Sequence, residues 1–61
     1  MAELTTKELD ALTDQLNYER MMACKYTAAK SAVQGQDLSA AFDRYAQQHR
    51  DNYNSLLNFL K

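Results

Sequence analysis

The chain contains no proline and a single glycine, Gly35, in 61 residues. Proline and glycine are the residues that most readily interrupt a helix, and 46% of the chain is apolar. Uninterrupted helix is therefore expected on both sides of Gly35. The sequence predicts an all-α fold with helices over about 6–33 and 38–60, in one domain that covers residues 1–61.

Signals for helix ends support this division. Thr5, with Glu8 three residues later, has the pattern of a capping box at the start of the first helix. Gly35 is expected to end that helix in a left-handed conformation, and Asp37 is expected to cap the second. Because only a few residues join the two helices, they are predicted to form an antiparallel hairpin.

Apolar residues recur in both expected helices at alternating steps of three and four, the spacing of a helix-bundle seam. In the first helix this stripe is Leu9, Leu12, Leu16, Glu19, Ala23, Tyr26, Lys30 and Val33. In the second it is Leu38, Phe42, Tyr45, His49, Asn52, Leu56 and Phe59. Apart from Lys30, each stripe is apolar except near its middle.

A second apolar stripe lies beside the first on each helix. It consists of Ala11, Tyr18, Met22 and Ala29 in one helix and of Ala46, Tyr53, Leu57 and Leu60 in the other. Two helices can cover one stripe each but not two, so we expect a homodimer in which two hairpins form a ferritin-like four-helix bundle. The residues expected at the dimer interface are Leu12, Leu16, Tyr18, Met22, Tyr45, Tyr53 and Leu57.

Three polar residues interrupt the middle of the seam: Glu19 in the first helix, and His49 and Asn52 in the second. Counting outward from Gly35 places Asn52 level with Glu19 and His49 roughly one turn away from Glu19, within about 5 Å along the bundle. Because buried polar groups must be paired, we expect a network in which Glu19 accepts hydrogen bonds from His49 or Asn52 and tyrosine hydroxyls complete the set.

A metal site held by Glu19 and His49 is the alternative. Di-metal four-helix proteins use a Glu-x-x-His motif, but here the run is Ala46-x-x-His49. A dimer would offer two glutamates and two histidines, enough for one tetrahedral ion such as zinc. Acid–base catalysis by the same pair is a third reading, although a tight bundle offers no substrate cleft.

Charge, hydropathy and cysteine content restrict the partners and the cellular compartment that the sequence predicts. The formal charge is −1 and no cluster of basic residues is present, so nucleic-acid binding is not expected. No apolar run approaches the roughly 18 residues needed to cross a bilayer, and the N-terminal stretch does not resemble a secretory signal. Cys24 is the only cysteine, which fits a reducing compartment and predicts a cytoplasmic site of synthesis.

The sequence resembles the coat F family of bacterial spore-coat proteins, within the ferritin-like superfamily. The similarity runs through LTDQLNYERMMACKY and DLSAAFDRYAQQHRDNYNSLLNFL. It is carried by Asn17-Tyr18-Glu19 and Lys25-Tyr26 in the first helix, and by Asp37-Leu38 and His49-Arg50 in the second.

This resemblance implies a ferritin-like bundle, here built from two half-length hairpins. It also implies a non-enzymatic structural role in the spore coat, with other coat proteins as further partners. Ferritin-like relatives bind iron through Glu and Glu-x-x-His, and of those positions Glu19 and His49 carry over, while Ala46 and Gln48 depart from the pattern. No cofactor is therefore expected, and a metal ion remains the alternative.

Overall fold

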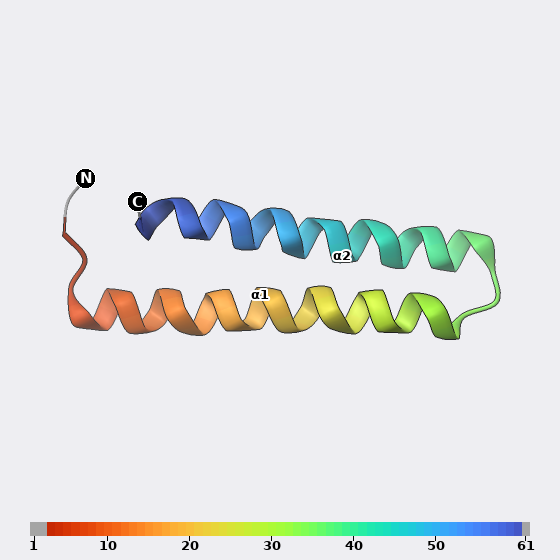
Figure 1. Ribbon diagram of the computed structural model, residues 1–61, viewed down its shortest axis with the longest axis horizontal. Helices are drawn as coiled ribbons and strands as arrows, with labels where there is room; N and C mark the ends of the chain where they lie inside the picture. The colour runs from red at the N-terminus through yellow and green to blue at the C-terminus, as the bar shows by residue number, and fades with distance from the viewer. Residues whose placement is uncertain (1–2, 61) are drawn as a thin grey trace.

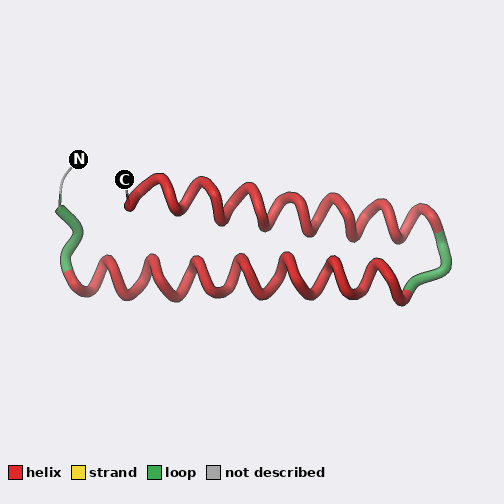
Figure 2. The backbone as a smooth tube through the Cα atoms, in the orientation of Figure 1, coloured by secondary structure: helices red, strands yellow, loops and turns green. Residues whose placement is uncertain are grey.

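The computed structural model describes residues 3–60 as two antiparallel α-helices lying side by side (Figure 1). Helix α1 spans Thr6–Ala32 and helix α2 spans Gln36–Leu57, followed by a short 3-10 helix, η1, at Asn58–Leu60. The remaining described residues form the segment before α1 and the link between the helices (Figure 2). The molecule measures 47 × 16 × 11 Å, the shape of one helical hairpin. The all-α hairpin is thus confirmed, with α2 beginning two residues earlier than predicted.

The predicted capping box at the start of α1 is confirmed. The Glu8 backbone N–H donates to the Thr5 hydroxyl oxygen at 3.1 Å, and the Thr5 backbone N–H donates to the Glu8 carboxylate at 3.0 Å. These two bonds satisfy donors that the first turn of a helix cannot pair internally. The first residue of α1 is therefore fixed by local sequence alone.

The prediction for the link between the helices was wrong. Gly35 has φ −83° and ψ 134°, an extended conformation, and it is the N-cap of α2 in place of Asp37. Val33, the C-cap of α1, is also extended, with φ −101° and ψ 150°. An extended link carries the chain from one helix to the other without a left-handed residue. Asp37 instead lies in the first turn of α2, where a carboxylate interacts favourably with the helix dipole.

The hairpin has almost no enclosed core. Ala23 and Ala46 are the only buried apolar residues among those described, at 8% and 1% exposure, and Glu19 is the only buried polar one. No large side chain within residues 3–60 is fully buried. Two helices in one layer cover only the line along which they touch, so the larger apolar side chains remain half-buried or exposed.

The contact line of α2 is displaced from the predicted seam. Leu38, Tyr45 and Phe59 belong to the predicted seam stripe, yet they are 47–58% exposed. Ala46, from the neighbouring stripe, is the most buried residue of the helix. Because an alanine lets two helix backbones approach closely, α2 turns that residue inward, and the bulky side chains of the seam stripe lie to one side of the contact line.

Candidate functional site

The middle of the hairpin contains a polar pair that joins the two helices. Glu19 is the central residue of α1, and its Oε1 atom lies 2.5 Å from Nδ1 of His49 on α2. The Asn52 side-chain amide also donates to Oε1 of Glu19, at 3.3 Å. The structure therefore brings together the three polar residues from the middle of the predicted seam, with Glu19 as the shared acceptor.

A fourth member of the network was not predicted from the sequence. The Gln15 amide donates to the second carboxylate oxygen of Glu19, Oε2, at 2.8 Å. Gln15 lies four residues before Glu19, the spacing at which helical side chains are neighbours, and this spacing was the available signal. With Gln15 included, both oxygens of the buried carboxylate have donors.

These contacts stabilise the ionised form of Glu19. The hydrogen bond from His49 holds the pKa of the Glu19 carboxyl below its ordinary value, and the amides of Gln15 and Asn52 act in the same direction. Burial raises the pKa but does not offset the hydrogen bonds. Since the carboxylate can only accept, Nδ1 of His49 must carry the proton in this contact, whether the ring is neutral or charged.

Aromatic rings surround His49. The ring of Tyr26 stacks on the imidazole, with centroids 5.7 Å apart and an interplanar angle of 8°, and Tyr18 meets it edge-on at 6.2 Å. Tyr26 also packs against Phe42 and Tyr45. The tyrosines thus support the polar pair with their rings, whereas hydroxyl contacts were predicted. We call this surface the aromatic face: Tyr18, Met22, Tyr26, Phe42, Tyr45 and His49.

In the observed geometry, Glu19 and His49 cannot both bind the same metal ion through the two atoms that touch. Ligands of one zinc ion each lie about 2.0–2.2 Å from it and stand roughly 3 Å or more apart in tetrahedral geometry. The 2.5 Å contact between Glu19 and His49 leaves no room for an ion between these two atoms. Within residues 3–60, moreover, no group of three or more His, Cys, Asp or Glu side chains is arranged to hold a metal.

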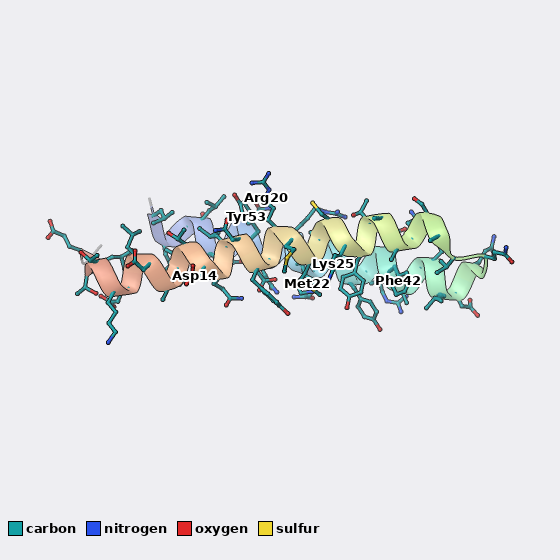
Figure 3. All side chains as sticks on the ribbon, turned by 90° about the horizontal axis from the view of Figure 1, so that it is seen from below. Asp14, Arg20, Met22, Lys25, Phe42 and Tyr53 are labelled. Atoms are coloured by element: carbon teal, nitrogen blue, oxygen red, sulfur yellow. The ribbon has the colours of Figure 1, made fainter. Side chains whose placement is uncertain are left out.

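A shallow groove of about 690 Å³ lies between the helices on the other side of the hairpin. Its lining includes Arg20, Cys24 and Thr27 from α1 and Arg50 and Tyr53 from α2. Figure 3 shows Arg20 and Tyr53 on one side of the hairpin and Phe42 of the aromatic face on the other. Cys24 is exposed in this groove, so its thiol faces away from the aromatic face.

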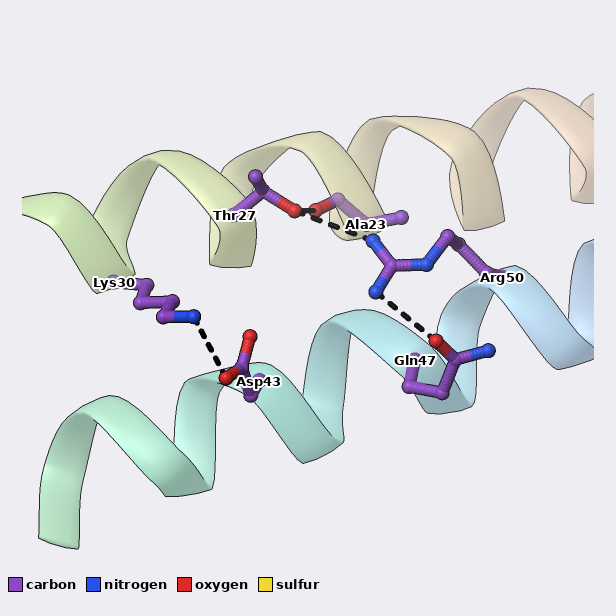
Figure 4. Close-up of polar contacts among 6 residues, drawn as sticks. All are labelled: Ala23, Thr27, Lys30, Asp43, Gln47 and Arg50. Atoms are coloured by element: carbon purple, nitrogen blue, oxygen red, sulfur yellow. Dashed lines mark hydrogen bonds and ion pairs between the residues drawn. The ribbon is translucent and has the colours of Figure 1, made fainter.

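Polar contacts bridge the two helices along this second side (Figure 4). Arg50 of α2 donates to the Thr27 hydroxyl of α1 at 3.4 Å, and within α2 it donates to the Gln47 amide oxygen at 3.2 Å. Lys30 and Asp43 form an ion pair at 2.7 Å, with side chains 42% and 55% exposed. Exposed pairs of this kind contribute little to stability.

The seven residues expected at a dimer interface fall on more than one side of the hairpin. Tyr18 and Tyr45 are exposed on the aromatic face, whereas Tyr53 lines the groove. Half-buried positions are taken by Leu12, Leu16, Met22, Tyr53 and Leu57. A single flat interface could therefore include Tyr18, Met22 and Tyr45 but not Tyr53.

No family model, curated protein or solved structure matches the chain. Among the described residues, neither helix combines the length and the apolar character that a membrane crossing requires.

Proposed function

We propose that the protein is a non-enzymatic structural protein that assembles as a homodimeric four-helix bundle, with a role like that of the spore-coat proteins it resembles. The observation that carries this proposal is the near absence of an enclosed core in one hairpin. A 61-residue chain is already short for independent stability, and a partner subunit is one of the usual ways in which small folds gain buried surface.

The polar network supports a structural reading of Glu19 and His49. Both oxygens of the carboxylate are occupied by side-chain donors, and the imidazole is held between aromatic rings. A satisfied network of this kind specifies the register of two helices that otherwise present similar apolar stripes. The resemblance to coat F proteins supplies the particular setting, a spore coat with other coat proteins as neighbours.

The test is the oligomeric mass of the purified protein at micromolar concentration, measured by sedimentation equilibrium or light scattering. We expect twice the chain mass of 7.0 kDa. We also expect dialysis against EDTA to leave both the mass and the helical content unchanged. A stable folded monomer would overturn the homodimer, and unfolding by EDTA would overturn the metal-independent structural role.

A metal-binding or redox protein is the second candidate, and one observation favours it. Metal-ligating histidines commonly donate one ring N–H to a carboxylate, as His49 does through Nδ1, and bind the metal through the other nitrogen. In that case Glu19 would orient the ligand and would not itself bind the ion. Elemental analysis of protein purified without an affinity tag decides between the two. A stoichiometric metal favours the second candidate, and less than about a tenth of an ion per dimer excludes it.

A further inference from the structure

We propose that a second copy of the chain packs on the aromatic face, an inference that rests on the homodimer proposed above and names its interface. The first support is an excess of surface. A folded monomer of 7.0 kDa is expected to expose about 4,000 Å², whereas the hairpin exposes 4821 Å². The difference, about 800 Å², is the area that each partner buries in a typical stable interface.

Part of the exposed apolar surface of the hairpin lies on this side of the molecule. Tyr18 and Tyr45 of the aromatic face are each 47% exposed. Leu38 precedes Tyr45 by 7 residues in α2, so the helical repeat places it on the same edge of that helix, and it is 48% exposed. The aromatic face thus continues toward the start of α2 as an apolar surface of the kind that marks an interaction site.

Charge favours the aromatic face over the groove as the surface that meets a second copy. An interface between two identical chains related by a twofold axis brings each patch against itself. The groove carries Arg20 and Arg50, so two grooves facing each other would bring four positive charges into one interface, where they repel. The aromatic face consists of uncharged side chains and His49, whose carboxylate partner Glu19 belongs to the same hairpin.

The position of the polar pair suits this arrangement. Because Glu19 is the central residue of α1, full overlap of two hairpins brings the two Glu19–His49 pairs to the same level. The bulky residues on either side of the centre would then pack against apolar residues of the partner. The polar layer would penalise shifted alignments, because these would place His49 against apolar side chains.

Two matched substitutions test the interface. Tyr45 and Met21 are 47% and 51% exposed in one hairpin. Met21 comes two residues after the buried Glu19, so at about 3.6 residues per turn it lies on nearly the opposite side of α1 from the contact with α2. We expect Tyr45→Glu to raise the dissociation constant of the dimer by about 30-fold or more, the scale of a hot-spot residue. Met21→Glu should change it by less than about threefold, and circular dichroism reports whether each variant remains helical.

The thiol of Cys24 provides a second test that needs no substitution. Because Cys24 is exposed in the groove, it should remain accessible in a dimer formed through the aromatic face. We expect a maleimide reagent to label the native dimer completely and the labelled protein to remain dimeric. Protection of Cys24 in the dimer, or dissociation upon labelling, would place the interface at the groove and overturn the inference.

The outcomes separate this inference from the proposed function. A dimer that dissociates with Tyr45→Glu, persists with Met21→Glu and labels fully at Cys24 supports both. A dimer that survives Tyr45→Glu overturns the assignment of the face and leaves the homodimer standing. A wild-type protein that is a folded monomer overturns both together.

Discussion

Nδ1 of His49 lies 2.5 Å from Oε1 of Glu19, so the single histidine of the chain is bound to a carboxylate on the other helix. The side chains of this pair are 18% and 8% exposed, which places the contact largely out of water. Removing one member of a buried pair leaves the other with an incomplete set of partners, and that penalty is larger than the worth of the contact itself.

We therefore expect His49→Ala to lower the free energy of unfolding by about 1–3 kcal/mol. The measurement is urea unfolding followed by circular dichroism, at one fixed protein concentration because a dimer is stabilised by concentration. Arg44→Ala, at an exposed position on α2, is the matched control and should change stability by less than about 0.5 kcal/mol. Equal losses in the two variants would show that the pair does not hold the helices together.

Acid should weaken the protein through Glu19. The pKa of this carboxyl is lowered in the folded state, chiefly by the hydrogen bond from His49, below its ordinary value of 4.5. The unfolded chain therefore binds the proton more readily, and stability falls as the pH drops through the folded pKa. At pH 6, which is above the ordinary pKa of 4.5, the contribution of Glu19 to stability is fully present. This contribution is lost progressively as the pH falls below about 4.5.

Comparison with Glu19→Gln isolates this effect. The pKa of Glu8 is also lowered, by its bond to the Thr5 backbone, but that residue is unchanged in the variant and cancels in the difference. We expect the loss of unfolding free energy between pH 6 and pH 3.5 to be smaller in Glu19→Gln than in the wild type. Parallel pH curves for the two proteins would contradict the assignment.

Local sequence rules account for part of this structure. Thr5 and Glu8 could be predicted as a cap because both partners lie within one turn of helix. The encounter of Glu19 with His49 followed from counting along two helices joined by a short link. The conformation of Gly35 could not be predicted in this way, because a glycine adopts extended and left-handed backbone equally well and the separation of the helices decides between them.

The rotation of α2 about its own axis also could not be predicted from the apolar periodicity. Two adjacent apolar stripes compete for one contact line, and a periodic pattern gives both the same weight. The structure turns Ala46 inward because its small side chain allows close approach, which leaves Tyr45 at the surface. Gln15 was missed for a related reason, since an exposed glutamine acquires a role only when the carboxylate one turn away is buried.

Close approach at Ala46 can be tested by enlarging the side chain. Ala46 is 1% exposed, so a leucine there must push the helices apart or shift its neighbours. We expect Ala46→Leu to lower the free energy of unfolding by about 1–3 kcal/mol, the usual effect of overpacking. Ala40→Leu, at an exposed position on the same helix, should have little effect. Comparable results for both, measured by thermal unfolding, would mean that Ala46 does not set the spacing of the helices.

The link between the helices offers a stabilising substitution. Gly35 has a negative φ and no side chain caps α2. Apart from Gly35 itself and its two neighbours in the chain, no heavy atom lies within 4 Å of the position where a Cβ would stand. A serine at this N-cap position supplies a hydroxyl oxygen that accepts a hydrogen bond from a backbone N–H in the first turn of α2. It also lowers the conformational entropy of the unfolded chain. We therefore expect Gly35→Ser to raise the free energy of unfolding by about 0.5–1 kcal/mol.

The sign of this change is informative, because a left-handed glycine at the end of α1 predicts the opposite. At a left-handed position a serine would lower the unfolding free energy by about 1 kcal/mol. Gln34→Ser, one residue earlier in the same link, is the control, since it leaves the N-cap unchanged. Thermal unfolding of the two variants beside the wild type decides the matter, and a lower midpoint for Gly35→Ser alone would contradict the extended link between α1 and α2.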